Sequence, residues 1–140
     1  MVNELGDVLW ADLRGLAHEA SRRSYAPYSH VHVGAAALSA TGVVAVGSNV
    51  ENASYGLTLC AECSLVSDLV RQGGGRLVAL VVVAGDGEPL APCGRCRQLL
   101  FEHAGPALLI DQGEHAPALR LDELLPHAFG PDDLPTRSTP

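Results

Sequence analysis

Apolar residues recur along the chain at two spacings, and these separate the expected helices from the expected strands. Between about residues 5 and 24, Leu5, Leu9, Leu13, Leu16 and Ala20 follow helical spacing and predict an amphipathic helix. The sequence Ala26-Pro27-Tyr28 is expected to stop it. Three further helices are expected over residues 60–72, 93–103 and 121–125.

Four apolar runs rich in β-branched residues or leucine predict strands, at residues 31–38, 43–46, 77–84 and 107–110. The first two flank Ala40-Thr41-Gly42 and predict a hairpin. The run 77–84 is apolar throughout, which predicts a strand buried on both faces. The order α-β-β-α-β-α-β-α predicts an α/β fold, with helices on the faces of a mixed sheet.

Length and composition narrow the classes of protein that fit this pattern. The 140 residues are expected to form a single domain, 1–140, with a flexible tail after about residue 130. An apolar content of 47% with 18% charged residues is typical of a globular chain. The net charge of -7 and the scattered basic residues argue against a nucleic-acid surface. No apolar run is as long as a membrane span and no signal pattern opens the chain, so we expect a cytoplasmic protein with reduced thiols.

The four cysteines form two C-x-x-C pairs, Cys60 with Cys63 and Cys93 with Cys96. In a reducing compartment such pairs indicate metal or redox chemistry, and neither pair has a thioredoxin-like context. All four thiols could hold a closed structural zinc site, which is the arrangement that spacing alone favours. Alternatively, Cys60, Cys93 and Cys96 could hold one zinc ion with an open fourth position, while Glu62 moves protons beside it.

Each cysteine block lies where a strand or loop leads into an expected helix. A helix N-terminus offers free N–H groups and a positive dipole end, which stabilise a thiolate. Residues i and i+2 do not share a face of a regular helix. Cys60 and Glu62 can therefore face one site only if Cys60 lies at the very start of its helix.

The neighbouring segments favour the open site, because together they resemble the small homotetrameric cytidine deaminases. The segments are Val33-Gly34-Ala35-Ala36, residues 49–58, Cys60-Ala61-Glu62, residues 92–98, and Leu124-Leu125-Pro126 with Phe129. The similarity runs from about Tyr25 to Phe129 and includes the P-C-x-x-C signature of zinc deaminases. It implies a three-layer α/β/α fold with a five-stranded mixed sheet, one Zn²⁺ per chain and a homotetramer with active sites shared between subunits. It also implies hydrolytic deamination of cytidine and 2'-deoxycytidine, a step of pyrimidine salvage.

The resemblance also implies a role for each matching residue. Cys60, Cys93 and Cys96 match the zinc ligands, Glu62 the proton shuttle, the Ala61 backbone a contact to the base, Asn49 and Glu51 the pair that binds the ribose hydroxyls, and Phe129 an aromatic that reaches the base from a neighbouring subunit. Other interpretations remain open for three of them. Asn49 could be a turn residue, Glu51 a solvated loop charge, and Phe129 an anchor of the tail on its own core.

Two positions depart from the family pattern. Cys63 stands where an arginine that moderates the thiolate charge is common, and we expect it to be a small buried side chain. The N-termini of the two helices, with Arg95 or Arg97, are candidates to balance that charge. Val31 stands where a phenylalanine is usual.

Two other functions remain as alternatives. Deaminases of modified cytosine nucleosides, such as the blasticidin type, share the block at residues 93–98, but the intact segment 49–58 argues against them. A zinc-stapled interaction module with a Cys₄ site is the alternative outside enzymes.

Overall fold

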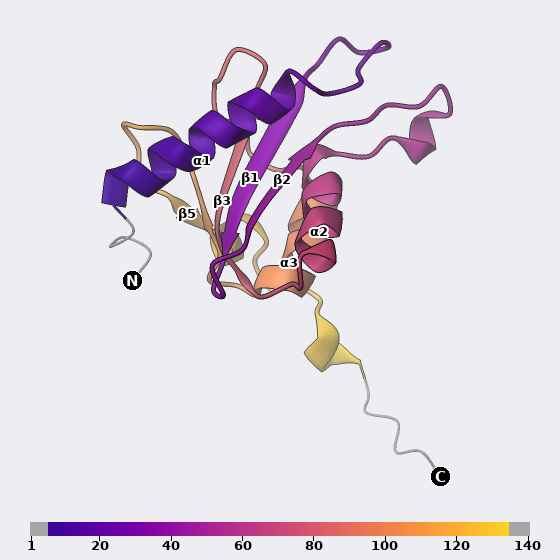
Figure 1. Ribbon diagram of the computed structural model, residues 1–140. Coiled ribbons are helices and arrows are strands. Elements are labelled where there is room, and N and C mark those ends of the chain that lie inside the picture. The colour runs from indigo at the N-terminus through magenta and orange to yellow at the C-terminus, as the bar shows by residue number, and fades with distance from the viewer. Residues whose placement is uncertain (1–5, 135–140) are drawn as a thin grey trace.

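A five-stranded mixed sheet forms the centre of the computed structural model, which describes residues 6–134 (Figure 1). The strands are β1 (Val33–Ser39), β2 (Val44–Ser48), β3 (Leu77–Ala84), β4 (Leu109–Ile110) and β5 (Leu119–Arg120). Their order in the sheet is β2-β1-β3-β4-β5, so β2 is an edge strand. Only the β3–β4 pair is parallel; the other three pairs are antiparallel. The predicted α/β class and the mixed sheet are confirmed.

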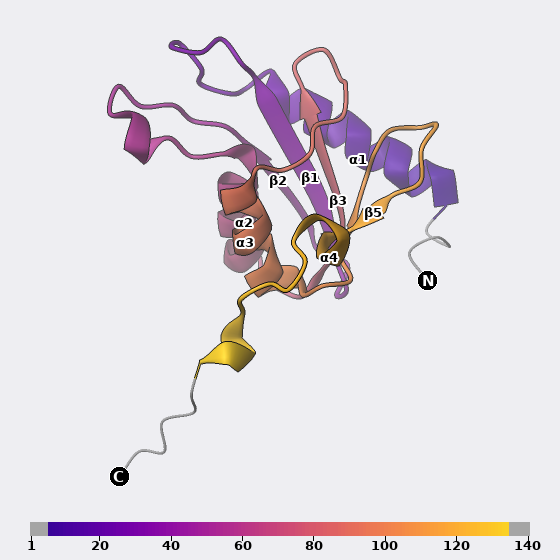
Figure 2. The same ribbon diagram turned by 180° about the vertical axis from the view of Figure 1, so that it is seen from behind.

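Helices cover both faces of this sheet, which gives the expected three layers. Helix α1 (Gly6–Ser21) crosses one face, while α2 (Ala61–Arg71) and α3 (Gly94–Ala104) lie side by side on the other (Figures 1 and 2). The short α4 (Leu121–Leu124) follows β5, and single 3₁₀ turns occur at Tyr55–Leu57 and Pro131–Asp133.

Strand β3 is buried on both faces, as its apolar sequence predicts. Leu80 and Val82 belong to the core under α2 and α3, and Ala79 and Val81 to the core under α1. Because successive strand residues point to opposite faces, one strand without polar positions supplies both cores. This is why the sequence of the central strand is a continuous apolar run.

The structure differs from the sequence-based prediction in several details, including β4, which spans only Leu109–Ile110 of the predicted strand 107–110. Helix α1 ends at Ser21 rather than near residue 24, and the predicted start at Leu5 lies outside the described residues. Strand β1 begins at Val33 rather than Val31, because the peptide groups of Val31 bond to side chains instead of to a strand. Strand β5 was not predicted from the hydrophobic pattern, since two residues are too short to show a period.

Glycine lets a helix lie directly on the sheet at two points. A Cβ atom on Gly34 would lie 1.8 Å from the Ala17 carbonyl oxygen in α1. A Cβ atom on Gly47 would lie 2.3 Å from the Ala61 oxygen and 2.4 Å from the Leu65 nitrogen in α2. Gly47 therefore sets how closely the first turn of α2 approaches β2.

We expect Gly47→Ala to destabilise the protein. The added methyl group meets backbone atoms that cannot rotate away, and such overpacking costs ~1–3 kcal/mol. Gly15→Ala is the matched control, because Gly15 is exposed on α1 with nothing within 4 Å of its would-be Cβ. It should stabilise the protein by ~0.5–1 kcal/mol, since glycine weakens a helix interior. Urea unfolding gives the free energy of unfolding of both variants. A Gly47→Ala variant as stable as wild type would contradict the close approach of α2 to β2.

Candidate active site

Three thiols from two helices meet at one point. The Sγ atoms of Cys60, Cys93 and Cys96 all lie within 4.8 Å of one another. Cys60 is the N-cap of α2 and Cys93 the N-cap of α3, and Cys96 lies in the first turn of α3. The start of each helix is thus directed at the same small volume, and Cys60 occupies the position that a shared site with Glu62 requires.

The donor set of this cluster suits zinc. Soft thiolates are preferred zinc ligands, and three of them leave a fourth position for water or substrate. Cys63, in the first turn of α2, is not part of the cluster. It is half-buried rather than buried as expected from the sequence. The geometry therefore favours the open three-thiol site over the closed Cys₄ site.

The backbone of α3 stabilises one thiolate of the cluster. The Cys96 N–H, together with the Arg95 N–H, bonds to the Cys93 sulfur and lowers the pKa of that thiol. Burial raises the pKa of both Cys60 and Cys96. Arg97 instead donates to the carbonyls of Pro92 and Leu124, at 2.8 and 2.9 Å.

A cleft of about 310 Å³ opens beside the cysteines, within the size range of small-molecule sites. It brings together all but two of the site residues predicted from the sequence, the exceptions being Cys96 and Phe129. Those that line it are Asn49, Glu51, Cys60, Ala61, Glu62 and Cys93. Aliphatic side chains of Val31, Val82 and Leu90 form its apolar wall. The cleft thus has a thiol end, a polar end and an apolar wall between them.

Glu62 lies at the thiol end and is nearly excluded from solvent. It is 4% exposed, lines the cleft and shares a hydrogen bond with the Cys96 thiol. Its position in the first turn of α2 places the carboxylate near the positive end of the helix dipole. A buried carboxylate beside three thiols is chemically placed to accept and return a proton at that end of the cleft.

Asn49 is held rigidly at the polar end. The side chain is 8% exposed; its Oδ1 accepts the Val33 N–H and its Nδ2 donates to the Val31 carbonyl, both at 2.8 Å. An amide has two N–H donors, so these bonds leave one donor for a ligand. Asn49 therefore fixes the chain before β1 and also presents an amide to the cleft.

Glu51 has a similar double role. Its carboxylate accepts the backbone N–H groups of Tyr28 and Ser29 and also the Ser29 hydroxyl. These bonds, led by the Ser29 hydroxyl, lower the pKa of Glu51, so it carries a charge at neutral pH. Ser29 received no role from the sequence, because its partner lies 22 residues away and no local spacing connects them.

Phe129 lies outside the cleft of its own chain. The side chain is 59% exposed, and the segment that carries it is held by Gln98, whose Nε2 donates to the Phe129 carbonyl at 2.8 Å. It is Phe101 that packs against the core, beside Gly130. The exposed ring of Phe129 thus packs less against its own core than the ring of Phe101 does.

The chain is similar in sequence and in fold to known cytidine deaminases. A family model described as "Cytidine and deoxycytidylate deaminase zinc-binding region" matches residues 11–110. The chain is 58% identical over 129 residues to a cytidine deaminase of Mycobacterium tuberculosis, covering 92% of this chain and 96% of the relative. It is 40% identical over 121 residues to a cytidine deaminase of Halalkalibacterium halodurans, covering 84% and 92%.

Solved structures agree with these sequence matches. The crystal structure of cytidine deaminase from M. tuberculosis superposes with a TM-score of 0.84 at 57% identity, covering 89% of this chain and 99% of that one. A cytidine deaminase from Burkholderia pseudomallei gives a TM-score of 0.75 at 40% identity, covering 85% and 98%.

We expect Cys63→Ala to retain one zinc per chain and Cys93→Ala to lose it, because Cys93 belongs to the thiol cluster and Cys63 does not. Zinc content of the purified variants, measured by atomic absorption, tests this directly. Loss of zinc from Cys63→Ala would instead support the closed site of four cysteines.

Proposed function

Because the chain belongs to the family of cytidine and deoxycytidylate deaminases with a zinc-binding region, we propose that it is a zinc-dependent cytidine deaminase. It hydrolyses cytidine and 2'-deoxycytidine to uridine and 2'-deoxyuridine with release of ammonia, and so serves pyrimidine salvage. The observation that carries the proposal is one cleft with a buried carboxylate beside three clustered thiols at one end and an amide with a carboxylate at the other.

Cys60, Cys93 and Cys96 hold the zinc ion in this proposal. Bound there, zinc supplies Lewis-acid activation of water, whose pKa it lowers towards neutrality. Glu62 would accept a proton from that water and pass it to the ring nitrogen as the hydroxyl adds to C4 of the base. It would then take the second proton from the added hydroxyl and pass it to the amino group, which leaves as ammonia when the C4–N bond breaks. Its burial suits this work, because a carboxylate shielded from bulk solvent exchanges protons with groups inside the cleft rather than with bulk water.

The rest of the cleft binds the nucleoside. Sugar hydroxyls both donate and accept hydrogen bonds, so the Asn49 amide and the charged Glu51 carboxylate form a suitable pair for them. The Ala61 backbone, at the first position of α2, contacts the base. Aliphatic groups of Val31, Val82 and Leu90 face the ring, which keeps water away from its surface.

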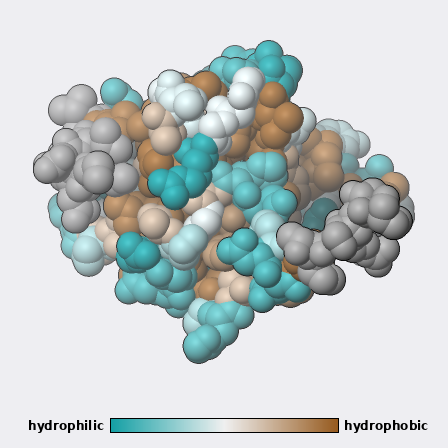
Figure 3. Space-filling view, turned by 90° about the horizontal axis from the view of Figure 1, so that it is seen from below, coloured by the Kyte–Doolittle hydropathy of each residue, from teal (hydrophilic) through white to brown (hydrophobic). Residues whose placement is uncertain are grey.

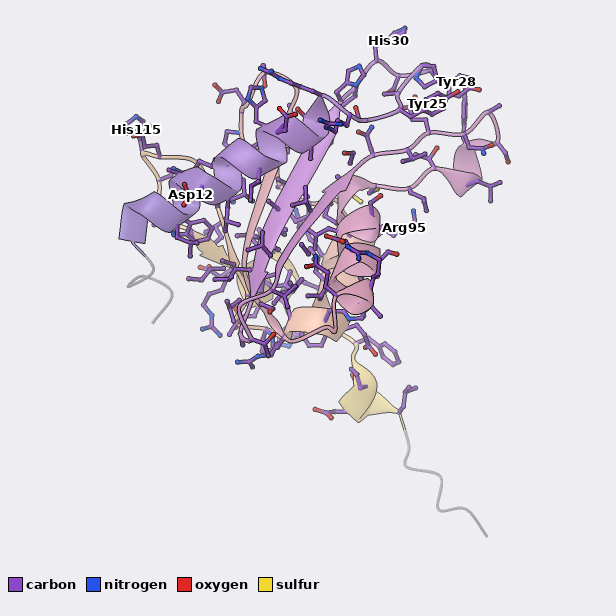
Figure 4. The ribbon with its side chains drawn as sticks, in the orientation of Figure 1. Asp12, Tyr25, Tyr28, His30, Arg95 and His115 are labelled. Atoms are coloured by element: carbon purple, nitrogen blue, oxygen red, sulfur yellow. The ribbon has the colours of Figure 1, made fainter. Side chains whose placement is uncertain are left out.

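A second copy of the chain completes the site in this proposal, within a homotetramer. The arm formed by residues 49–60 projects from the body and exposes Tyr55 and Leu57 at 77% and 65% (Figure 1). Tyr25 and Tyr28 lie beside it on the preceding loop (Figure 4). Apolar surface also appears between polar residues on the lower face (Figure 3). Exposed aromatic residues gathered on one protrusion are typical of a surface that another chain covers.

Phe129 is the residue that the neighbouring subunit contributes. No aromatic side chain among the described residues lines the cleft, yet a pyrimidine ring stacks well on one. Phe129 is exposed, and Gln98 fixes its backbone to α3. A side chain that is held in place but unused by its own chain is available to an adjacent site.

We also propose that the chain works as a single domain in the cytoplasm, on a nucleoside rather than a nucleic acid. Its four cysteines are free, which suits a reducing compartment. None of the helices between residues 6 and 134 is long and apolar enough to cross a membrane. The net charge of -7 opposes binding to a polyanion.

Glu62→Gln should bind zinc but lose turnover. The amide keeps the shape of the side chain and cannot relay a proton, so kcat should fall by at least the ~10²–10⁴-fold typical of general acid–base loss. Loss of cytidine absorbance measures the rate. Glu102→Gln, at an exposed carboxylate of α3, should keep wild-type activity. Near-normal turnover in Glu62→Gln would remove Glu62 from the mechanism.

Phe129→Ala should weaken cytidine binding without loss of zinc. A lost stack between a base and an aromatic ring costs ~1–3 kcal/mol, which corresponds to roughly a tenfold to hundredfold increase in KM. Steady-state kinetics and zinc content of the same preparation give both quantities.

Mixing Phe129→Ala chains with Glu62→Gln chains tests whether the site is shared. A site with both residues intact then forms only across a subunit boundary, so the mixture should exceed both parents in activity. Exchange of subunits is verified with differently tagged chains. Exchange without any gain in activity would show that Phe129 serves its own chain.

A further inference from the structure

Three polar side chains, two from α2 and one from its C-cap residue Gln72, form a regular ladder with the backbone of β2. The Ser64 hydroxyl donates to the Ser48 carbonyl at 2.8 Å, Asp68 Oδ2 accepts the Val46 N–H at 3.0 Å, and Gln72 Nε2 donates to the Val44 carbonyl at 3.0 Å. Four residues of a helix rise by about 6 Å and two residues of a strand by about 6.6 Å. The rungs therefore stay in register over the length of β2.

The ladder acts at the open edge of the sheet. Strand β2 pairs with β1 on one side only, so every second residue directs its backbone groups outward. The helix can reach these groups because Gly47 has no side chain to hold α2 away. Side chains of α2 thus take the place of a neighbouring strand and fix the height of the helix along β2.

Ser64 is the rung nearest the cleft, and it touches both ends of the site through its neighbours. Its backbone N–H donates to the carbonyl of Cys60, and its hydroxyl to the carbonyl of Ser48, the residue before Asn49. Ser48 is itself fixed, since its hydroxyl donates to the Ala20 carbonyl at 2.6 Å. Ser64 is therefore a link of one residue between the thiol end and the polar end of the cleft.

We propose that Ser64 is a positioning residue that sets the separation between the metal end of the cleft, at Cys60 and Glu62, and the sugar end, at Asn49. This rests on the proposed function, in which one nucleoside must place its sugar on Asn49 while its base reaches Glu62. Both contacts form together only if α2 lies at the correct height on β2. A displacement of about 1 Å in such an arrangement can cost ~10²-fold in rate.

The effect of losing the hydroxyl should appear in kcat more than in KM. A substrate held by its sugar still binds when α2 shifts, but its base then lies too far from Glu62 for efficient proton transfer. Loss of an interaction needed mainly in the transition state lowers kcat and kcat/KM together. Zinc should stay bound, because two of its three ligands, Cys93 and Cys96, are held at the start of α3, to which the ladder does not bond.

The experiment compares Ser64→Ala, Ser64→Thr and Asp68→Ala with wild type, using cytidine kinetics, zinc content and thermal unfolding. Ser64→Ala should lose roughly tenfold to hundredfold in kcat with zinc retained. Ser64→Thr restores the hydroxyl and should recover most of that loss. Asp68→Ala removes the next rung, one turn from the cleft, so it should lower the unfolding temperature and leave kcat near the wild-type value.

The outcomes separate this inference from the proposed function. If wild type deaminates cytidine and Ser64→Ala keeps its kcat, the positioning role is wrong while the function stands. An equal loss of kcat in Asp68→Ala would also overturn it, because the ladder would then act through stability alone. If zinc-loaded wild type does not deaminate cytidine, the proposed function fails and this inference fails with it. If Ser64→Ala does not fold, Ser64→Thr still tests the inference, because it restores the hydroxyl and should keep most of the wild-type kcat. A folded, zinc-loaded Ser64→Thr with a large loss of kcat would overturn the inference.

Discussion

Convergence of two helix N-termini on one point is the constraint on which the rest of the site depends. Cys60 and Cys93 cap their helices, so the thiols meet only if α2 and α3 lie on the same face of the sheet and begin at the same end. The connections supply that arrangement. A long arm leads into α2 from β2, and the segment after β3 leads into α3. Because each helix end brings free N–H groups, the fold provides ligands and part of their charge balance together.

Contact between α2 and the edge strand makes this convergence rigid. Gly47 brings backbone against backbone, and Ser64, Asp68 and Gln72 fix the register. The same contact protects the edge of the sheet, whose outward groups would otherwise be free to pair with another strand. One interface therefore serves stability and also the position of Glu62, which lies in the first turn of that helix.

Residues at the polar end combine support with recognition. Asn49 holds the chain ahead of β1, and Glu51 holds the turn at Tyr28 and Ser29. A side chain whose orientation is fixed by backbone bonds loses little entropy when it binds a ligand. The tip of the arm, at Tyr55 and Leu57, and the residue Phe129 have the opposite character, because all three are mostly exposed on their own chain. This contrast between firmly held and exposed side chains supports the proposal that further copies of the chain cover the exposed ones.

The sequence by itself determined the central strand, the hairpin, the helices and the identity of the thiols, because these depend on local spacing. A run without polar positions must be buried on both faces. The metal-binding thiols and the acidic residue beside them lie in two short segments, Cys60-Ala61-Glu62 and Pro92-Cys93-Gly94-Arg95-Cys96, so local spacing is enough to identify them. Only the tertiary structure decided that Cys63 stays out of the cluster, that β5 completes the sheet, and that Ser29 and Ser64 support the cleft. Those features rest on contacts between residues far apart in the chain or on single short side chains. Hydrophobic periodicity indicates which face of an element is buried but not which residues that face contacts. It therefore predicts neither the long-range contacts nor the roles of single short side chains.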